Sequence, residues 1–281
     1  MTVKNTFLHK KLNHRTIEIL YEDDFLCVIN KPAGLLSVPY SGSNEKNAQQ
    51  ILEEIMRKNG TFNNKHKPYP VHRLDRETSG VMMFALNENA QKKIMDGWHK
   101  IVSERLYIAI AENPRNKALF LKDSGLIDDE LAFNAHNIGY VPKKEKNVKT
   151  VPARTNYKIV ERGKTHTLFE LSLDTGKKNQ IRAHLASKGY PLAGDKNYHA
   201  KTDNFGRLCL HARTLEFTHP FTKELLKFEV KEPVEWMEYV KKGDTGNFTF
   251  AHKNVELGQK RLSKKERAHM NFIEAGKSFG K

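Results

Sequence analysis

The chain has 281 residues and carries 48 Lys and Arg against 33 Asp and Glu, which gives a formal net charge of +15. This length can bury a core in one or two domains, and the positive charge favours polyanionic partners, with nucleic acid expected ahead of an anionic membrane surface. We expect a cytoplasmic protein, because no apolar run approaches the ~20 residues that cross a bilayer, the N-terminus lacks the apolar core of a signal peptide, and two Cys are too few for a disulfide framework.

The first sixty residues predict packing elements. Residues 1–16 are polar and basic, which is typical of an N-terminal arm. Two apolar segments, 17–21 and 25–30, are separated by acidic residues and predict a β-hairpin. Residues 45–59 carry apolar side chains on one face of a helix, and Gly60 is suited to end it.

Residues 71–80 concentrate ionisable side chains in a short turn, which an apolar run follows at 81–86. Asp75 lies between Arg73 and Arg76, and nearby positive charge favours the carboxylate form. An ionised Asp75 suits a nucleophile or a base and does not suit a proton donor. Considered by itself, the cluster fits a surface salt-bridge network equally well, and such networks contribute little to stability.

The next segments predict a helix that ends near His99 and a strand at 105–111. Large aliphatic residues alternate with other residues along this strand, so the two sets face opposite ways. Tyr107 is expected opposite the aliphatic row, where neighbouring alanines leave room for a planar ring or a ligand. On the pattern alone, an ordinary tyrosine on the sheet surface is the better-supported alternative.

The rest of the chain predicts an irregular stretch followed by more strands than helices. Residues 113–152 lack a clear period and include a lysine-rich loop. We expect four later strands, at 155–160, 167–173, 215–218 and 226–230. We also expect two later helices, at 179–189 and 233–240. We predict an α+β protein with a mixed, largely antiparallel sheet and flanking helices over residues 17–242, followed by a basic tail at 243–281.

Two stretches resemble the RluA-type RNA pseudouridine synthases. They are His-Arg-Leu-Asp-Arg-Glu-Thr-Ser-Gly at 72–80 and Leu-Asp-Thr-Gly-Lys-Lys-Asn-Gln-Ile-Arg-Ala-His at 173–184. The resemblance extends over about residues 17–240. It implies the fold of that family, with a central cleft that accepts RNA, and the isomerisation of specific uridines to pseudouridine in structured ribosomal or transfer RNA. No cofactor or metal is expected, because the 13 His are scattered without paired ligand spacing.

The resemblance also implies roles for three residues that are far apart in the chain. Asp75 is expected to be the catalytic aspartate and Arg182 to form an ion pair with it. Tyr107 is expected to lie against the uracil face and to assist the final proton removal. The residues leave open whether Asp75 attacks the sugar, attacks the base or removes a sugar proton.

Further residues are implied to contact RNA. A target base in folded RNA must first be flipped out, and Arg73 is the candidate that stacks in the gap it leaves. His72 is expected to be structural or an RNA contact, and Lys31 and Lys177 to contact phosphates. Asp195 is expected to order the cleft without acting chemically.

This sequence departs from the common family pattern at three positions. Lys177, Asn179 and Arg105 stand where Arg, His and Lys are frequent, and we expect these changes to alter RNA contacts and not catalysis. Two alternatives remain: a non-catalytic RNA-binding or ribosome-assembly protein, and a metal-free ribonuclease that uses His72 and His184. A monomer is the default expectation.

Overall fold

The computed structural model describes residues 16–40, 42–143 and 148–243. The predicted N-terminal arm and C-terminal tail lie almost entirely outside these ranges, and the predicted domain boundaries remain predictions. Among the residues that the structure describes, no helix is both long and apolar enough to cross a membrane.

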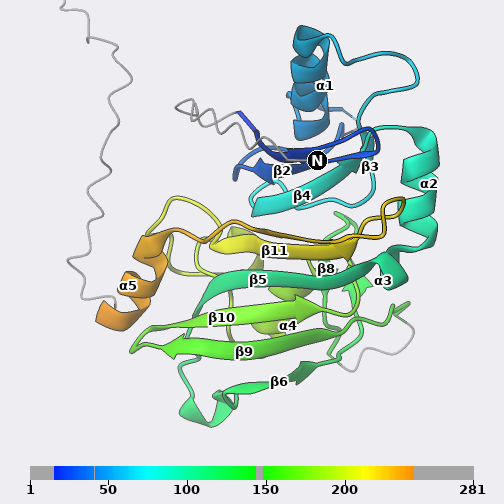
Figure 1. Ribbon diagram of the computed structural model, residues 1–281. Helices are drawn as coiled ribbons and strands as arrows, with labels where there is room; N and C mark the ends of the chain where they lie inside the picture. Colours follow the sequence, from blue (N-terminus) through cyan, green and yellow to red (C-terminus); the bar gives the residue numbers. More distant parts are fainter. Residues whose placement is uncertain (1–15, 41, 144–147, 244–281) are drawn as a thin grey trace, which may run out of the picture. The chain divides into compact units, whose positions relative to one another are not determined.

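Ten strands of the described chain form one sheet, and two further strands form a small separate hairpin (Figure 1). The order in the sheet is β1-β2-β4-β11-β5-β10-β9-β6, with β3 paired to β4 and β12 paired to β11. The strands are β1 (Glu18–Glu22), β2 (Leu26–Lys31), β3 (Tyr69–Pro70), β4 (Ser79–Ala85), β5 (Val102–Glu112), β6 (Ser124–Ile127), β7 (Ala132–Phe133), β8 (Gly139–Tyr140), β9 (Thr155–Arg162), β10 (His166–Leu173), β11 (Leu210–Thr218) and β12 (Leu225–Glu229). The helices are α1 (Ala48–Asn59), α2 (Glu88–Asp96), α3 (Trp98–Ile101), α4 (Gln180–Ser187) and α5 (Val234–Lys242).

The sheet is mixed and largely antiparallel, as predicted. Strands β4 and β11 pair in parallel, whereas the other pairs in the sheet are antiparallel. The β4–β11 pair joins two halves of the sheet: β1 to β4 on one side, and β5, β6 and β9 to β12 on the other.

The first half of the sheet is covered on both faces. Helix α1 begins at Asn47, whose side chain forms a capping box with Gln50, and it ends at Gly60 in the left-handed conformation. Its apolar face packs on one side of β2 and β4, and helix α2 packs on the other side. Every residue of β4 is therefore buried, which explains the continuous apolar run after the 71–80 turn.

The second half of the sheet is covered by α4. Ala109 and Ala111 of β5 are fully buried in the same cluster as Ile181 and Leu185 of α4. These two alanines therefore make room for a helix and not for a ligand. Tyr107 itself contacts the clusters of both halves.

Two elements differ from the sequence prediction. The helix expected to run to His99 is interrupted at Gly97, and α3 is a separate turn. The irregular stretch contains β6, a short edge strand that pairs with β9. A four-residue strand gives too little alternation for its period to be recognised.

The Gly80→Ala variant is expected to lose most of its stability. Gly80 has a φ of +114°, and an added Cβ would lie 2.0 Å from the carbonyl oxygen of Ala212 in β11. This oxygen belongs to a hydrogen-bonded strand and cannot move away, so we expect a loss of about 3 kcal/mol or more in the free energy of unfolding. Urea unfolding measures it. The control is Gly60→Ala, at φ +76° with no heavy atom within 4 Å of an added Cβ. Equal losses in the two variants would contradict the tight β4–β11 junction.

Candidate active site

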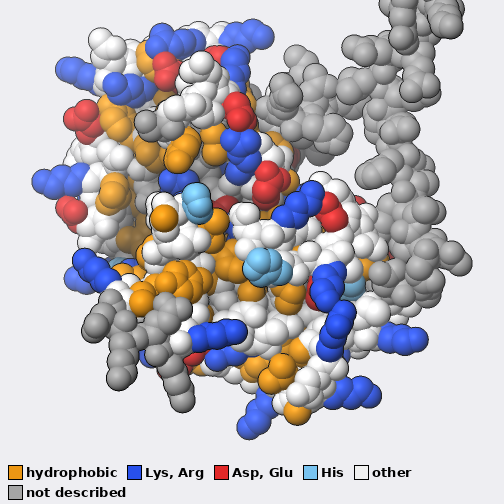
Figure 2. Space-filling model, turned by 180° about the vertical axis from the view of Figure 1, so that it is seen from behind, with side chains coloured by type: hydrophobic (Ala, Val, Ile, Leu, Met, Phe, Trp, Pro, Cys, Tyr) orange, Lys and Arg blue, Asp and Glu red, His pale blue; other side chains and the backbone are white. Residues whose placement is uncertain are grey.

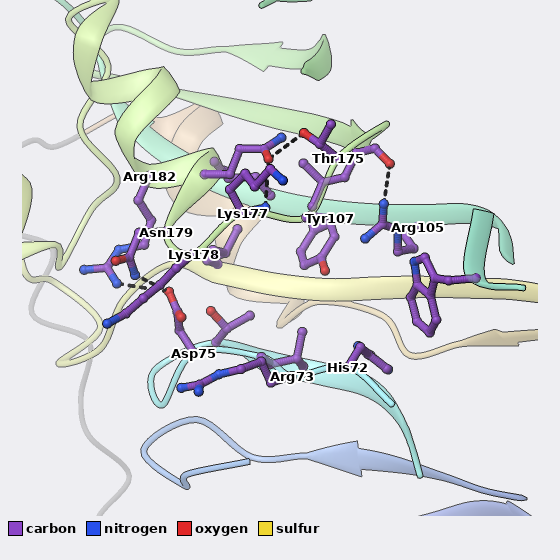
Figure 3. Close-up of a pocket in the computed structure, with 18 of the residues that line it drawn as sticks. His72, Arg73, Asp75, Arg105, Tyr107, Thr175, Lys177, Lys178, Asn179 and Arg182 are labelled. Atoms are coloured by element: carbon purple, nitrogen blue, oxygen red, sulfur yellow. Dashed lines mark hydrogen bonds and ion pairs between the residues drawn. The ribbon is translucent and has the colours of Figure 1, made fainter. Parts of the chain in front are cut away.

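A cavity of about 550 Å³ lies beside the junction of the two halves of the sheet (Figure 3). Its walls come from segments that are distant in sequence: the 71–78 turn, the end of α2 with α3, strand β5, and the 173–182 segment that starts α4. The two stretches that carry the family resemblance therefore meet in one place. Asp75, Tyr107, Arg182, Arg73, His72 and Lys177 all line this cavity.

Asp75 lies in the tight turn before β4, where its carbonyl oxygen accepts a hydrogen bond from Thr78 N at 3.1 Å. Its side chain is 21% exposed. Arg182 Nη1 lies 3.2 Å from Asp75 Oδ2, and Asn179 Nδ2 donates to the same oxygen at 2.6 Å. Two donors from the start of α4 therefore hold one carboxylate oxygen.

Arg182 connects two carboxylates. Its Nε and Nη2 donate to both oxygens of Asp195 at 2.7 and 2.8 Å, while its Nη1 reaches Asp75. The Asp195 side chain is only 1% exposed. Burial alone would lower the pKa of Arg182, but the hydrogen bond and charge of Asp195, helped by Asp75, raise it above its usual value. Asp195 therefore fixes the Arg182 guanidinium, in agreement with the expectation that Asp195 orders the cleft. The remaining nitrogen of Arg182, Nη1, points at Asp75.

Tyr107 extends from β5 into the space between Asp75 and Arg105 (Figure 3). Its ring is partly buried, and burial raises the pKa of its phenol. The hydroxyl is therefore protonated at neutral pH. A planar face and a hydroxyl donor are thus presented to whatever fills the cavity.

The cations at the cavity mouth are available for a ligand. Arg73 is exposed, and its side chain forms no hydrogen bond or ion pair with any residue that the structure describes. Lys177 and Lys178 are also exposed and line the cavity. Arg105 differs, because its Nη2 donates to the carbonyl oxygen of Leu173 at 2.7 Å and its guanidinium packs 5.8 Å from the Trp98 ring centre.

Comparison with known proteins decides the family. The family model described as RNA pseudouridylate synthase matches residues 25–187, which include all of the cavity walls named above. Over 230 residues, the chain is 32% identical to the uncharacterized RNA pseudouridine synthase YlyB of Bacillus subtilis, which covers 80% of this chain and 72% of that protein. The chain belongs to the RluA-type RNA pseudouridine synthases.

Two other relatives carry more specific names. The dual-specificity RNA pseudouridine synthase RluA of Haemophilus influenzae is 31% identical over 218 residues, which are 76% of this chain and 93% of that protein. The ribosomal large subunit pseudouridine synthase D of Neisseria meningitidis serogroup B is 32% identical over 229 residues, 77% of this chain but only 58% of the relative.

Solved structures show the same fold. The human RNA pseudouridylate synthase domain containing 1 superposes with a TM-score of 0.61 at 19% identity, over 80% of this chain and 86% of the human one. The human domain containing 4 gives a TM-score of 0.59 at 23% identity, over 78% and 90%. The predicted α+β pseudouridine synthase fold is confirmed.

The prediction that Lys31 contacts an RNA phosphate is wrong. Lys31 is fully buried, and its Nζ donates to the carbonyl oxygens of Pro32, Leu35 and Arg76 at 2.9, 2.7 and 3.0 Å. With these bonds its ammonium group has no donor left for RNA. Lys31 instead ties the 32–35 loop to the turn that carries Asp75, which makes it a structural residue of the synthase.

The two histidines of the ribonuclease hypothesis do not share the cavity. His72 lines it, and its Nε2 accepts a hydrogen bond from Met83 N at 3.0 Å. His184 is fully buried between Thr155 and the carbonyl oxygen of Asp129, and it is not among the residues lining the cavity. An acid–base pair of these histidines is therefore excluded in this arrangement. The bond from Met83 N gives His72 a structural contact, and its expected RNA contact stays a prediction.

His72 is expected to make stability depend on pH. Burial, with a smaller effect from Arg105, lowers the pKa of His72 to about 3, whereas an unfolded histidine titrates near 6.5. Between these values only the unfolded state binds the proton, so the free energy of unfolding falls as pH drops from about 6.5 toward 3, by up to about 1.4 kcal/mol per unit. Urea titrations from pH 7.5 to 4.5 measure the slope. The His72→Gln variant should have a shallower slope, and an unchanged slope would contradict a neutral, partly buried His72.

Sequence reasoning missed the direct contact between Asn179 and Asp75. The presence of Asn at position 179 was expected to affect RNA contacts alone. Its side-chain amide nevertheless makes the shorter of the two hydrogen bonds to the Asp75 carboxylate, at 2.6 Å against 3.2 Å from Arg182. One signal was present, because residues three apart lie on the same face of a helix and Arg182 was already expected to contact Asp75.

The described residues contain no group of three or more His, Cys, Asp or Glu placed to hold a metal ion.

Proposed function

We propose that this synthase converts specific uridines of structured ribosomal or transfer RNA to pseudouridine, with Asp75 as the catalytic carboxylate. The observation that supports this most is the convergence of Asp75, Arg182 and Tyr107 on one open cavity from three separate segments. The name of one relative refers to the ribosomal large subunit and supports ribosomal RNA as a substrate, and the dual specificity in the name of another is compatible with a second RNA class.

The reaction requires little beyond a positioned base or nucleophile. The bond between N1 of uracil and C1′ of ribose breaks, the base rotates, a bond forms between C5 and C1′, and the proton on C5 is released while N1 gains one. Arg182 and Asn179 hold Oδ2 of the Asp75 carboxylate and so fix the orientation of this side chain, which either a nucleophile or a base requires.

Tyr107 contributes a surface for the base. The aromatic ring lies against the uracil face in this proposal, and stacking of this kind contributes roughly 1–3 kcal/mol per base. Burial raises the pKa of its phenol, so the protonated hydroxyl is available as a hydrogen-bond donor beside the base. Its assistance in the final removal of the C5 proton remains part of the proposal.

Arg73 is proposed to stabilise the flipped state of the RNA. Extruding a base costs a few kcal/mol, and a planar guanidinium can stack in the vacated space. Arg73 is exposed, lacks a protein partner in the described chain and is only two residues from Asp75. The same turn can therefore place Asp75 at the flipped base and Arg73 in the gap that this base leaves in the RNA helix.

RNA affinity is expected to depend strongly on salt. On the face drawn in Figure 2, Lys and Arg side chains are widespread and acidic side chains are fewer. Replacing Lys177 or Lys178 by Ala should reduce the slope of log K against log salt concentration by about 0.7 for each lysine that neutralises a phosphate of single-stranded RNA. Filter binding of labelled bulk transfer RNA at several salt concentrations measures this slope. Lys58→Ala at the exposed end of α1 is the control, and an equal change in the control would contradict a phosphate track at the cavity.

Tritium release tests the proposed activity. Whole-cell RNA carrying tritium at C5 of uridine is incubated with the purified protein, and the label that appears in water is counted. We expect release that saturates at a fixed number of sites per RNA molecule. A folded protein that releases no label from ribosomal or transfer RNA would contradict the proposal and favour the non-catalytic alternative.

A further inference from the structure

Within the described part of the chain, the Asp75 carboxylate is held through one of its two oxygens, Oδ2. Oδ2 accepts hydrogen bonds from Asn179 Nδ2 at 2.6 Å and from Arg182 Nη1 at 3.2 Å. No residue that the structure describes donates to Oδ1. The two donors come from the same end of α4, so they approach from one direction and leave the other oxygen free (Figure 3).

Asn179 makes this contact instead of capping its own helix. It occupies the N-cap position of α4, where its side chain forms no capping bond. The asparagines at the starts of α1 and α2 do cap, with side chains that accept from Gln50 N and Ala90 N. A capping bond is worth about 1 kcal/mol, so α4 forgoes a usual source of stability.

The backbone at Asn179 is also unusual. Its φ is +56°, in the left-handed region, where asparagine is one of the few tolerated residues other than glycine. Its side chain is nearly buried, with the residue 9% exposed. The left-handed turn directs the amide at Asp75 while Gln180 satisfies neighbouring polar groups of the loop. Uncommon conformations that a surrounding network maintains are typical of functional sites.

We infer that Asn179 is a positioning residue for catalysis and that Oδ1 of Asp75 is the oxygen that acts on the nucleotide. With Arg182, Asn179 fixes the side-chain rotamer of Asp75 and satisfies Oδ2, so the unoccupied lone pairs of Oδ1 are presented to the cavity. Asn179 adds this restraint without adding charge. The inference rests on the proposed function of Asp75.

A purely conformational role makes the opposite prediction. If Asn179 served only to tolerate a positive φ, glycine would serve equally well or better, because it has no Cβ penalty there. The Asn179→Gly variant therefore keeps the backbone conformation and removes only the amide. Asn137 has the same φ of +56° but is exposed and does not line the cavity, so Asn137→Gly is the matched control.

Single-turnover tritium release at saturating enzyme, together with RNA affinity, tests the inference. A hydrogen bond to a charged group is worth about 1.5–3 kcal/mol, which corresponds to a rate about 10- to 150-fold lower in Asn179→Gly. RNA affinity should stay within about 2-fold of wild type, and Asn137→Gly should match wild type in both. Asn179→His tolerates the same backbone and retains an N–H donor, so it should be faster than Asn179→Gly.

The outcomes separate this inference from the proposed function. If Asp75→Asn is inactive while Asn179→Gly reacts at the wild-type rate, or loses only RNA affinity, the positioning role is overturned and the proposed function stands. If Asp75→Asn is as active as wild type, the proposed function itself fails. Should Asn179→Gly not fold, Asn179→Asp tolerates the left-handed turn, removes the donor and places a second carboxylate against Asp75, so a wild-type rate in this variant would overturn the positioning role.

Discussion

The Asp75→Asn variant is expected to lose tritium release from C5-labelled RNA by at least about 10³-fold. The amide cannot act as a nucleophile or base, and a positioned general base alone contributes roughly 10²- to 10⁴-fold. The fold should be retained, since carboxylate and amide have nearly the same shape and the amide oxygen can still accept from Asn179 and Arg182. Circular dichroism and a thermal melt check the fold, and RNA binding should be close to wild type.

A matched control separates loss of chemistry from loss of charge. Asp123 is 94% exposed and lies outside the cavity, so Asp123→Asn makes the same chemical change and should leave activity unchanged. Release by Asp75→Asn at more than about a tenth of the wild-type rate would contradict a catalytic role for this carboxylate.

Replacing Arg182 by Met is expected to impair both stability and activity. Asp195 would keep a buried charge without the two hydrogen bonds at 2.7 and 2.8 Å that now compensate it. Breaking a buried ion pair by removing one partner typically costs about 3–5 kcal/mol of unfolding free energy. Asp75 would lose its charged neighbour, so we also expect release to fall by about 10²-fold or more. Urea unfolding and tritium release measure the two effects.

The double variant Arg182→Met with Asp195→Leu distinguishes these effects. Replacing both members of a buried pair by apolar residues is often close to neutral for stability. We therefore expect the double variant to regain much of the stability that Arg182→Met loses and to remain inactive. Recovery of activity together with stability would mean that Arg182 acts only through the fold.

The fold was largely predictable because its main elements have local signatures. The amphipathic period of residues 45–59, the alternation at 105–111 and the apolar run after Gly80 each correspond to an observed element. The parallel pairing of β4 with β11 was not predictable in this way. It depends on Ala212 lying against Gly80, and these residues are far apart in the chain.

The site could be predicted only for residues that belong to a recognisable sequence motif. The local clustering of charges at 72–77 indicated chemistry, and the family resemblance supplied Tyr107 and Arg182, which the structure places at the same cavity. Lys31 was misassigned because an exposed and a buried lysine look alike in a sequence. The carbonyl oxygens that enclose its ammonium group include that of Arg76, which is 45 residues away.

Asn179 shows why a substitution cannot be judged by its chemistry alone. Its polarity suggested an RNA contact at the surface, whereas a left-handed turn at the start of α4 directs it inward to Asp75. The functional consequence depends on a backbone dihedral angle and on a partner about a hundred residues away. The dihedral angle is not encoded in the local pattern, and the partner could be inferred only from the spacing of Asn179 to Arg182.

Mapping of pseudouridines in cells tests the central claim most directly. Ribosomal and transfer RNA are compared by chemical modification and sequencing from a deletion strain, from its parent, and from the deletion strain carrying either the wild-type or the Asp75→Asn gene at equal protein levels. We predict that one or a few defined positions lose pseudouridine in the deletion strain and regain it only with the wild-type gene. Restoration of those positions by Asp75→Asn, or the absence of any lost position, would contradict the account.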